Sequence, residues 1–103
     1  MEEKEILDTS VVLTRKEGLV TALTVVEHPV CFRKEFEILF PEDKDYMTAI
    51  AIAGKLRAQG TPVGAVDILI ASIGLNRSLT VVTKDKDFKT IKTVAPELKV
   101  RLV

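Results

Sequence analysis

Histidine, cysteine and tryptophan are almost missing from this chain, which narrows the kinds of site it can build. The 103 residues contain one histidine, His28, one cysteine, Cys31, and no tryptophan. A single chain of this composition can form no disulfide, no cysteine-based zinc site and no histidine-rich metal site. No hydrophobic run approaches the ~20 residues that cross a bilayer. The charged, mostly acidic first five residues are the opposite of a secretory signal. We therefore expect a cytoplasmic protein without membrane contact.

Net charge is also missing, because fifteen basic and fifteen acidic residues cancel. The balance neither favours nor excludes a nucleic-acid partner, so only the distribution of charge along the chain can indicate one. From Lys84 to Arg101 six basic residues face three acidic ones, a weak indication of a polyanionic partner. A length of 103 residues with 47% hydrophobic content predicts a single domain, residues 1–103, with a real core.

Short hydrophobic runs alternate with amphipathic stretches, which predicts an α/β sheet with crossover helices. Strands are expected at residues 5–8, 19–26, 35–40, 79–83 and 99–103. Helices are expected at residues 41–60 and 65–76, with a short helical turn at 87–91. In the second helix the spacing predicts a buried face made of Val66, Leu69, Ile70 and Ile73.

The connection between the first two strands allows two interpretations. A parallel pair needs a crossover of about a dozen residues, which a short helix over 10–17, capped by Ser10 and stopped by Gly18, would just provide. The alternative is an antiparallel hairpin closed around residues 15–18. We favour the parallel pair because it places Asp8 and Glu27 at the same edge of the sheet.

Four acidic residues stand where the chain changes structural character. Asp8 follows the first hydrophobic run, and Glu27 ends the second. Asp67 opens the helix at 65–76, and Asp85 comes two residues after the strand at 79–83. A carboxylate beside buried hydrophobic residues is costly unless a cation or strong donors compensate. Oxygen ligands without histidine or cysteine favour a hard cation, Mg²⁺ or Mn²⁺, and such ions promote phosphodiester hydrolysis.

Each acid also has a simpler structural interpretation. Asp8 and Asp67 can cap the helices that follow them. Asp85 can be a turn residue, and Glu27 a solvated charge at a strand end. Asp87 is close to Asp85, but we assign it to capping the helical turn at 87–91. The order and spacing of the other four together favour the metal site.

The segments that carry these acids resemble the PIN domain, and within it the VapC-type toxin ribonucleases. The segments are residues 6–10, 23–27, 64–71 and 82–88. Their most specific feature is an aspartate that opens a hydrophobic helix eighteen residues before Asp85, in a Thr-x-Asp-x-Asp-Phe sequence. The resemblance extends from Glu5 to Val103.

The resemblance implies a three-layer PIN-like α/β domain, with a parallel sheet flanked by helices. It implies a Mg²⁺- or Mn²⁺-dependent ribonuclease acting on RNA, a small antitoxin as partner, and a homodimer. The residues that match the family's catalytic and metal-binding acids are Asp8, Glu27, Asp67 and Asp85. Two further residues, Ser10 and Thr83, match polar positions beside the metal site.

The chain also departs from this pattern, because only eighteen residues separate Asp8 from Glu27, where the family has a longer helical segment. We expect the shortening to leave hydrophobic surface for a homodimer contact at Val11, Val12, Leu13, Phe32 and Phe36, with Cys31 in the core or at that contact. An alternative function is a catalytically weak PIN scaffold that binds RNA or protein. A phospho-acceptor signalling domain is a weaker alternative, because Thr9 stands where such domains carry a second acid.

Overall fold

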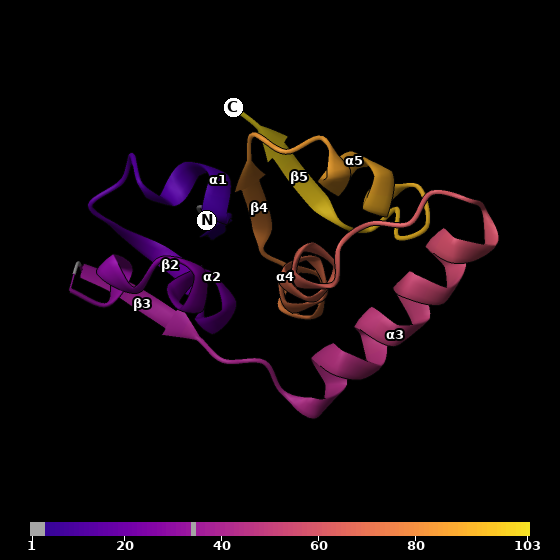
Figure 1. Cartoon of the computed structure of the whole chain (residues 1–103), viewed down its shortest axis with the longest axis horizontal. Helices are drawn as coiled ribbons and strands as arrows, with labels where there is room; N and C mark the ends of the chain where they lie inside the picture. Colours follow the sequence, from indigo (N-terminus) through magenta and orange to yellow (C-terminus); the bar gives the residue numbers. More distant parts are fainter. Residues whose placement is uncertain (1–3, 34) are drawn as a thin grey trace.

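The computed structural model describes residues 4–33 and 35–103, which contain a five-stranded parallel sheet (Figure 1). The strand order is β3-β2-β1-β4-β5, and every neighbouring pair is parallel. The strands are β1 (Glu5–Leu7), β2 (Glu17–Thr21), β3 (Glu35–Leu39), β4 (Thr80–Thr83) and β5 (Lys99–Leu102). The strand order reverses between β1 and β4, and ligands of open α/β sheets bind beyond the carboxyl ends of strands at such a point.

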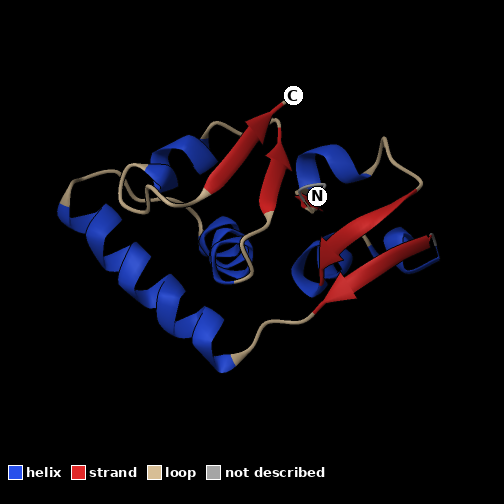
Figure 2. Ribbon diagram, turned by 180° about the vertical axis from the view of Figure 1, so that it is seen from behind, coloured by secondary structure: helices blue, strands red, loops and turns tan. Residues whose placement is uncertain are grey.

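Helices cover both faces of this sheet, which gives the three layers that the sequence predicts. The helices are α1 (Thr9–Val12), α2 (Ala22–Glu27), the 3-10 helix η1 (Pro29–Arg33), α3 (Asp43–Ala58), α4 (Ala65–Asn76) and α5 (Asp87–Lys92). Figures 1 and 2 show α4 near the centre, with α3 as the outermost helix alongside it. Among the described residues, no helix is both long and hydrophobic enough to cross a membrane.

Two main groups of buried side chains hold the layers together. The first joins α3, α4 and α5 to β4 and includes Ile52, Leu56, Ile70, Val81 and Phe88. The second lies on the other face of the sheet and includes Leu7, Val11, Val12, Val20, Cys31 and Val82. Val11 and Val12 are therefore fully buried, so the prediction that they leave hydrophobic surface for a homodimer contact is wrong. Leu13 and Phe32, in contrast, are 53% and 74% exposed.

The second strand ends earlier than predicted, and the residues after it form a helix. Strand β2 stops at Thr21, whose side-chain oxygen accepts a hydrogen bond from the backbone N–H of Thr24 at 3.4 Å and so caps α2. Within α2, Thr24 is buried whereas Val26 is 79% exposed. The prediction of a strand over 19–26 is therefore wrong: capping and one-sided burial outweigh the weak strand preference of β-branched residues.

The crossover from β1 to β2 is shorter than the predicted helix. Only residues 8–16 connect the strands, and α1 begins at Thr9 with Asp8, not Ser10, as its N-cap. The pairing is nonetheless parallel, which rules out the hairpin. Gly18 helps the strands approach, because its φ is 143° and a Cβ atom there would lie 2.8 Å from Leu7 Cδ1.

The remaining elements confirm the predicted α/β pattern. Helix α4 has the predicted bounds, and β3, β4, β5 and α5 agree within one residue at either end. One detail of α4 is wrong: Val66 is 39% exposed, whereas Leu69, Ile70 and Ile73 are buried as predicted. Val66 lies in the first turn, before the helix passes under the rest of the core.

A buried ion pair fixes the direction of α4 relative to α3. Asp45, fully buried at the start of α3, accepts hydrogen bonds from Arg77 Nη1 at 3.0 Å and Nη2 at 3.1 Å, and from Asn76 Nδ2 at 2.9 Å. Burial by itself raises the pKa of Asp45, but the hydrogen bonds from Arg77 and Asn76 outweigh it and hold that pKa below its usual value. The end of α4 is thus anchored, and its first turn, with Asp67, is directed at the carboxyl ends of β1 and β4.

Candidate metal centre

Asp8 lies at the carboxyl end of β1, and only one of its two carboxylate oxygens accepts hydrogen bonds from described residues. Asp8 is only 3% exposed. Its Oδ2 accepts hydrogen bonds from Ser10 Oγ at 2.9 Å and Thr83 Oγ1 at 2.8 Å. Its Oδ1 is buried without a hydrogen-bond partner among the described residues. Leaving a buried acceptor unpaired costs about 1–3 kcal/mol, and more for a charged group. A cation bound to this oxygen would offset that cost.

Two backbone groups fix the hydroxyls that hold Asp8. The N–H of Lys84 donates to Ser10 Oγ at 2.9 Å, and the N–H of Asp85 donates to Thr83 Oγ1 at 2.9 Å. Each hydroxyl accepts from the backbone and so has its one proton to give to Asp8. Ser10 and Thr83 therefore orient the carboxylate, at the positions that the sequence indicated beside the metal site.

Three further carboxylates converge next to Asp8. Oxygens of Asp67, Asp85 and Asp87 all lie within 4.8 Å of one another. Asp67 lies in the first turn of α4, where the positive end of the helix dipole favours an ionised acid. Asp85 and Asp87 follow β4, the strand that pairs with β1. The switch point of the sheet thus carries a cluster of acids from three separate segments.

The prediction that Asp87 caps the helical turn at 87–91 is wrong. The N-cap of α5 is Lys86, whose side chain makes no capping hydrogen bond. Instead Asp85 Oδ1 accepts a hydrogen bond from the backbone N–H of Asp87 at 2.9 Å. The Asp87 carboxyl group is therefore available to the cluster. The spacing of Asp85 and Asp87 could have indicated this position, because the turn after β4 places carboxylates two residues apart on the same side.

The acids act on one another electrostatically. Burial, followed by the negative charges of Asp8, Asp85, Asp87 and Glu27, raises the pKa of Asp67 to about 6. Glu27 makes the smallest of these contributions. It is exposed at the last residue of α2, not at the end of a strand as predicted, and lies outside the tight cluster. Its negative charge nevertheless contributes to the raised pKa of Asp67.

These observations fit a hard divalent cation. All the donors are carboxylate oxygens, the ligand type that Mg²⁺ and Mn²⁺ prefer. The free Asp8 oxygen and the raised pKa of Asp67 both indicate a missing positive charge. Asp8, Asp67 and Asp85 would hold the ion, with Asp87 close enough to join them and Glu27 at the margin.

A comparison with known families agrees with this arrangement. The PIN domain matches residues 6–94, which hold every acid of the cluster. The chain belongs to the PIN domain family. A comparison with curated protein sequences finds no match.

Solved structures share the fold of this PIN domain at low sequence identity. One is VapBC-5 from Mycobacterium tuberculosis, a toxin–antitoxin system, with a TM-score of 0.79, 21% identity, and coverage of 99% of this chain and 100% of that one. Another is DNA-bound VapBC from Salmonella typhimurium, with a TM-score of 0.74, 21% identity, and coverage of 97% and 98%. A third is VapBC2 from Rickettsia felis bound to a promoter DNA fragment, with a TM-score of 0.75, 17% identity, and coverage of 95% and 97%.

Proposed function

We propose that this PIN domain is a ribonuclease that uses Mg²⁺ or Mn²⁺ to hydrolyse RNA phosphodiester bonds. The observation that carries the proposal is the acid cluster at the switch point of the sheet. Asp67, Asp85 and Asp87 offer oxygens within 4.8 Å of one another, and Asp8 presents a buried oxygen with no hydrogen-bond partner in the described chain. A cluster of this kind needs a cation, and the cation gives the site its chemistry.

The residues of the chain divide this task. Asp8, Asp67 and Asp85 hold the ion, and Glu27 completes the negative site from the end of α2. Ser10 and Thr83 keep Asp8 turned so that one oxygen stays free for coordination. A bound cation would supply Lewis-acid chemistry, which polarises a phosphodiester and lowers the pKa of an attacking water molecule.

Basic side chains beside the cluster are suited to the substrate backbone. Lys84 and Lys86 flank Asp85 and are exposed. They can neutralise RNA phosphates on either side of the bond to be cut, and binding should weaken as salt concentration rises. Of the basic residues between 84 and 101, Lys84 and Lys86 are the two that we assign to this role.

We further propose that the enzyme is the toxin of a toxin–antitoxin pair in the cytoplasm, controlled by a small antitoxin. Two observations support this. The chain shares its fold with VapBC toxin–antitoxin structures. In addition, four hydrophobic side chains of the α1–α2–η1 region are strongly exposed, namely Leu13, Val26, Val30 and Phe32. Val26 precedes Glu27, so a protein that covers this surface reaches the catalytic acids.

A second candidate is a metal-holding scaffold that binds RNA or protein but cuts little. The observation in its favour is that Glu27 is exposed at the end of a helix of six residues, outside the tight cluster. Metal binding is common to both candidates, so only a cleavage assay separates them.

The test is incubation of the purified protein with a mixed RNA pool, with and without Mn²⁺. We expect metal-dependent cleavage that disappears in Asp8→Asn and Asp67→Asn, because Asn keeps the shape of the side chain but loses the charge that holds the ion. Asp43→Asn, an exposed acid in the first turn of α3, is the matched control and should cut normally. Cleavage that persists in excess chelator or in Asp67→Asn would refute the ribonuclease site. Metal-bound, folded protein that cuts no RNA would favour the scaffold.

A further inference from the structure

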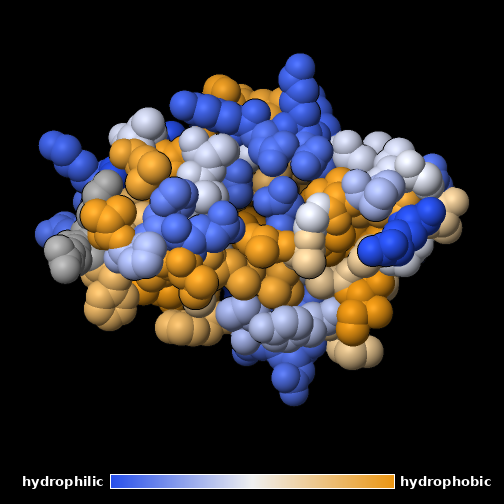
Figure 3. Space-filling view, in the orientation of Figure 1, coloured by the Kyte–Doolittle hydropathy of each residue, from blue (hydrophilic) through white to orange (hydrophobic). Residues whose placement is uncertain are grey.

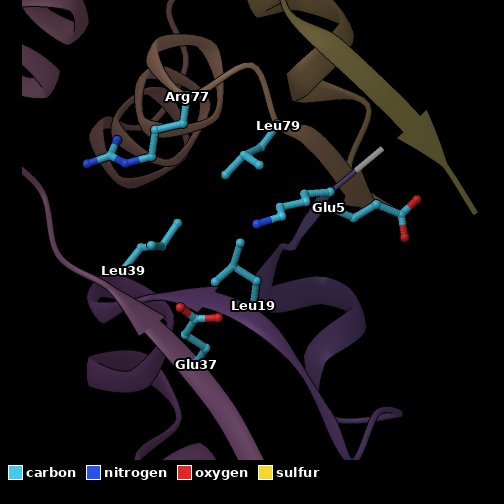
Figure 4. Close-up of a pocket in the computed structure, with 7 residues that line it drawn as sticks. Glu5, Leu19, Glu37, Leu39, Arg77 and Leu79 are labelled. Carbon is cyan, nitrogen blue, oxygen red and sulfur yellow. The ribbon is translucent and has the colours of Figure 1, made fainter. Parts of the chain in front are cut away.

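Helix α2, which carries Glu27, follows directly from the less supported half of the sheet. Helices α3, α4 and α5 pack against β4 and β5. In the other half, Leu19 of β2 and Leu39 of β3 line an open groove of about 610 Å³ (Figure 4). The charged residues Lys4 and Arg77 also line this groove, and Figure 3 shows hydrophobic surface across the centre of this side of the molecule. Part of β2 thus faces a groove instead of a helix, so β2 by itself does little to fix α2.

The hydrophobic contacts of α2 hold the helix on the sheet without fixing the direction of Glu27. Leu23 packs against the core that joins α3, α4 and α5 to β4, and Val25 packs against the core on the other face of the sheet. Such contacts are non-directional, so they set the depth of the helix more than its rotation. Glu27 is exposed at the last residue of α2, and helix ends fray. The direction of its side chain therefore depends on a directional contact elsewhere in α2.

A hydrogen bond between two threonine hydroxyls provides such a contact. The Oγ1 atoms of Thr9 and Thr24 lie 3.2 Å apart, and either can be the donor. Thr24 is fully buried, whereas Thr9 is partly exposed at the start of α1. The backbone oxygen of Thr24 accepts a hydrogen bond from the N–H of His28 at 2.9 Å, which closes the turn that contains Glu27. Thr24 is therefore bonded to α1 through its side chain and to the last turn of α2 through its backbone.

The same hydrogen bond connects that turn to the segment of Asp8. Thr9 directly follows Asp8 in the chain. The next residue, Ser10, holds Oδ2 of Asp8 together with Thr83 of β4. Consecutive residues at the start of α1 thus connect Asp8 to two elements, with Ser10 on the side of β4 and Thr9 on the side of α2. The position of α2 is in this way tied to the position of the most buried acid of the cluster.

We propose that Thr9 and Thr24 are positioning residues that hold the carboxylate of Glu27 beside the acid cluster. The inference rests on the role proposed above for Glu27 at the metal site. Both hydroxyls act through α2, because their hydrogen bond fixes the turn that carries Glu27. Without it the turn can rotate or fray, and the charge of Glu27 then stabilises the ion less. Partners that orient metal ligands typically change metal affinity 10–100-fold, and for an acid at the margin we expect about tenfold.

Calorimetric titration of the intact chain with Mn²⁺ tests this role without reference to RNA cleavage. Thr24→Val keeps the shape of the side chain but removes the hydroxyl, and it should weaken Mn²⁺ binding about tenfold. Thr24→Ser keeps the hydroxyl and should bind Mn²⁺ nearly as the wild type does. Thr9→Val, at the partly exposed end of the bond, should match Thr24→Val, and combining the two should add little. Thr14→Val is the matched control, because the Thr14 hydroxyl donates to the backbone oxygen of Val11 and not to α2.

A cycle with Glu27→Gln separates positioning from a general loosening of the fold. Glu27→Gln should weaken Mn²⁺ binding at least about tenfold in the wild type, but far less in Thr24→Val, where the carboxylate is already misplaced. Independent, multiplying effects of the two changes would overturn the proposal. It would also fall if Glu27→Gln weakened binding while Thr24→Val did not, a result that leaves the metal site intact. A wild type that binds no Mn²⁺ would instead remove the proposed metal site together with this inference.

Discussion

Replacing Asp67 by Asn should stabilise the metal-free protein while removing its response to metal. The folded structure raises the pKa of Asp67 from 3.8 to about 6, through burial and then through the charges of Asp8, Asp85, Asp87 and Glu27. A carboxyl group with a raised pKa binds its proton more tightly in the folded state than in the unfolded state. Ionisation of Asp67 therefore destabilises the metal-free fold as pH rises between these two values.

The size of the effect follows from the shift. A change of about two units corresponds to about 3 kcal/mol at neutral pH. Because the Asp67 side chain is partly exposed, solvent screening reduces this to about 1–2 kcal/mol. For a domain of this size, Asp67→Asn should raise the melting temperature in chelator at pH 7 by about 5–10 °C. At pH 3.5, which is below both pKa values, the carboxyl is mostly protonated in both states, so the difference between variant and wild type should nearly vanish.

Thermal unfolding in chelator and in excess Mn²⁺, repeated from pH 3.5 to pH 7.5, measures both effects. At a hundredfold excess over its dissociation constant, an ion stabilises the wild type by about 2.7 kcal/mol, and the variant should gain far less. Asp43→Asn is the matched control: it removes an exposed first-turn acid and should cost about 0.3–1 kcal/mol at neutral pH, the opposite sign. Equal stability of Asp67→Asn and wild type in chelator at pH 7, or an equal gain from Mn²⁺, would refute the reasoning.

Three other substitutions test individual parts of the structure. Thr83→Val keeps the shape but removes a proton donor to Asp8, so it should weaken Mn²⁺ binding about tenfold by calorimetry, whereas Thr93→Val should not. Asp87→Asn should also weaken Mn²⁺ binding, and an unchanged affinity would return Asp87 to a purely structural role. Asp45→Asn leaves Arg77 without its buried partner and should cost about 3–5 kcal/mol in urea unfolding, a value that a change below 1 kcal/mol would contradict.

Much of the candidate site could be predicted because hydrophobic runs determine where β1, β4 and α4 lie. Asp8 directly follows β1, and Asp67 lies in the first turn of a helix whose bounds the pattern predicts correctly. The carboxyl ends of parallel strands lie at one edge of the sheet, so a parallel sheet places Asp8 and Asp85 at the same edge. That β1 and β4 are neighbours, which brings the two acids together, comes from the structure. Both conclusions depend on the order of elements and not on side-chain detail.

The parts that could not be predicted depend on local hydrogen bonds. Nothing in the hydrophobic run from Leu19 to Val26 shows that Thr21 caps a helix, because β-branched residues are common in strands and tolerated in helices. Likewise, Asp85 and Asp87 are both acids that favour accepting a backbone hydrogen bond before a helix. In the structure Asp85 accepts from the N–H of Asp87, and Lys86 is the N-cap of α5. Sequence pattern and residue propensity do not distinguish these alternatives, and the hydrogen bonds of the folded structure do.

The position of the acid cluster does not depend on the short segment between β1 and α2. Asp8 is held by the pairing of Leu7 with Val82 and by the hydroxyl of Thr83, both of which belong to the centre of the sheet. The link between Asp45 and Arg77 anchors α4, and through it Asp67, from the opposite end of the helix. Glu27 alone is placed by the shortened region, and it alone of the four predicted acids is exposed. The short segment between β1 and α2 therefore affects only the margin of the acid cluster and leaves Asp8, Asp67 and Asp85 in position.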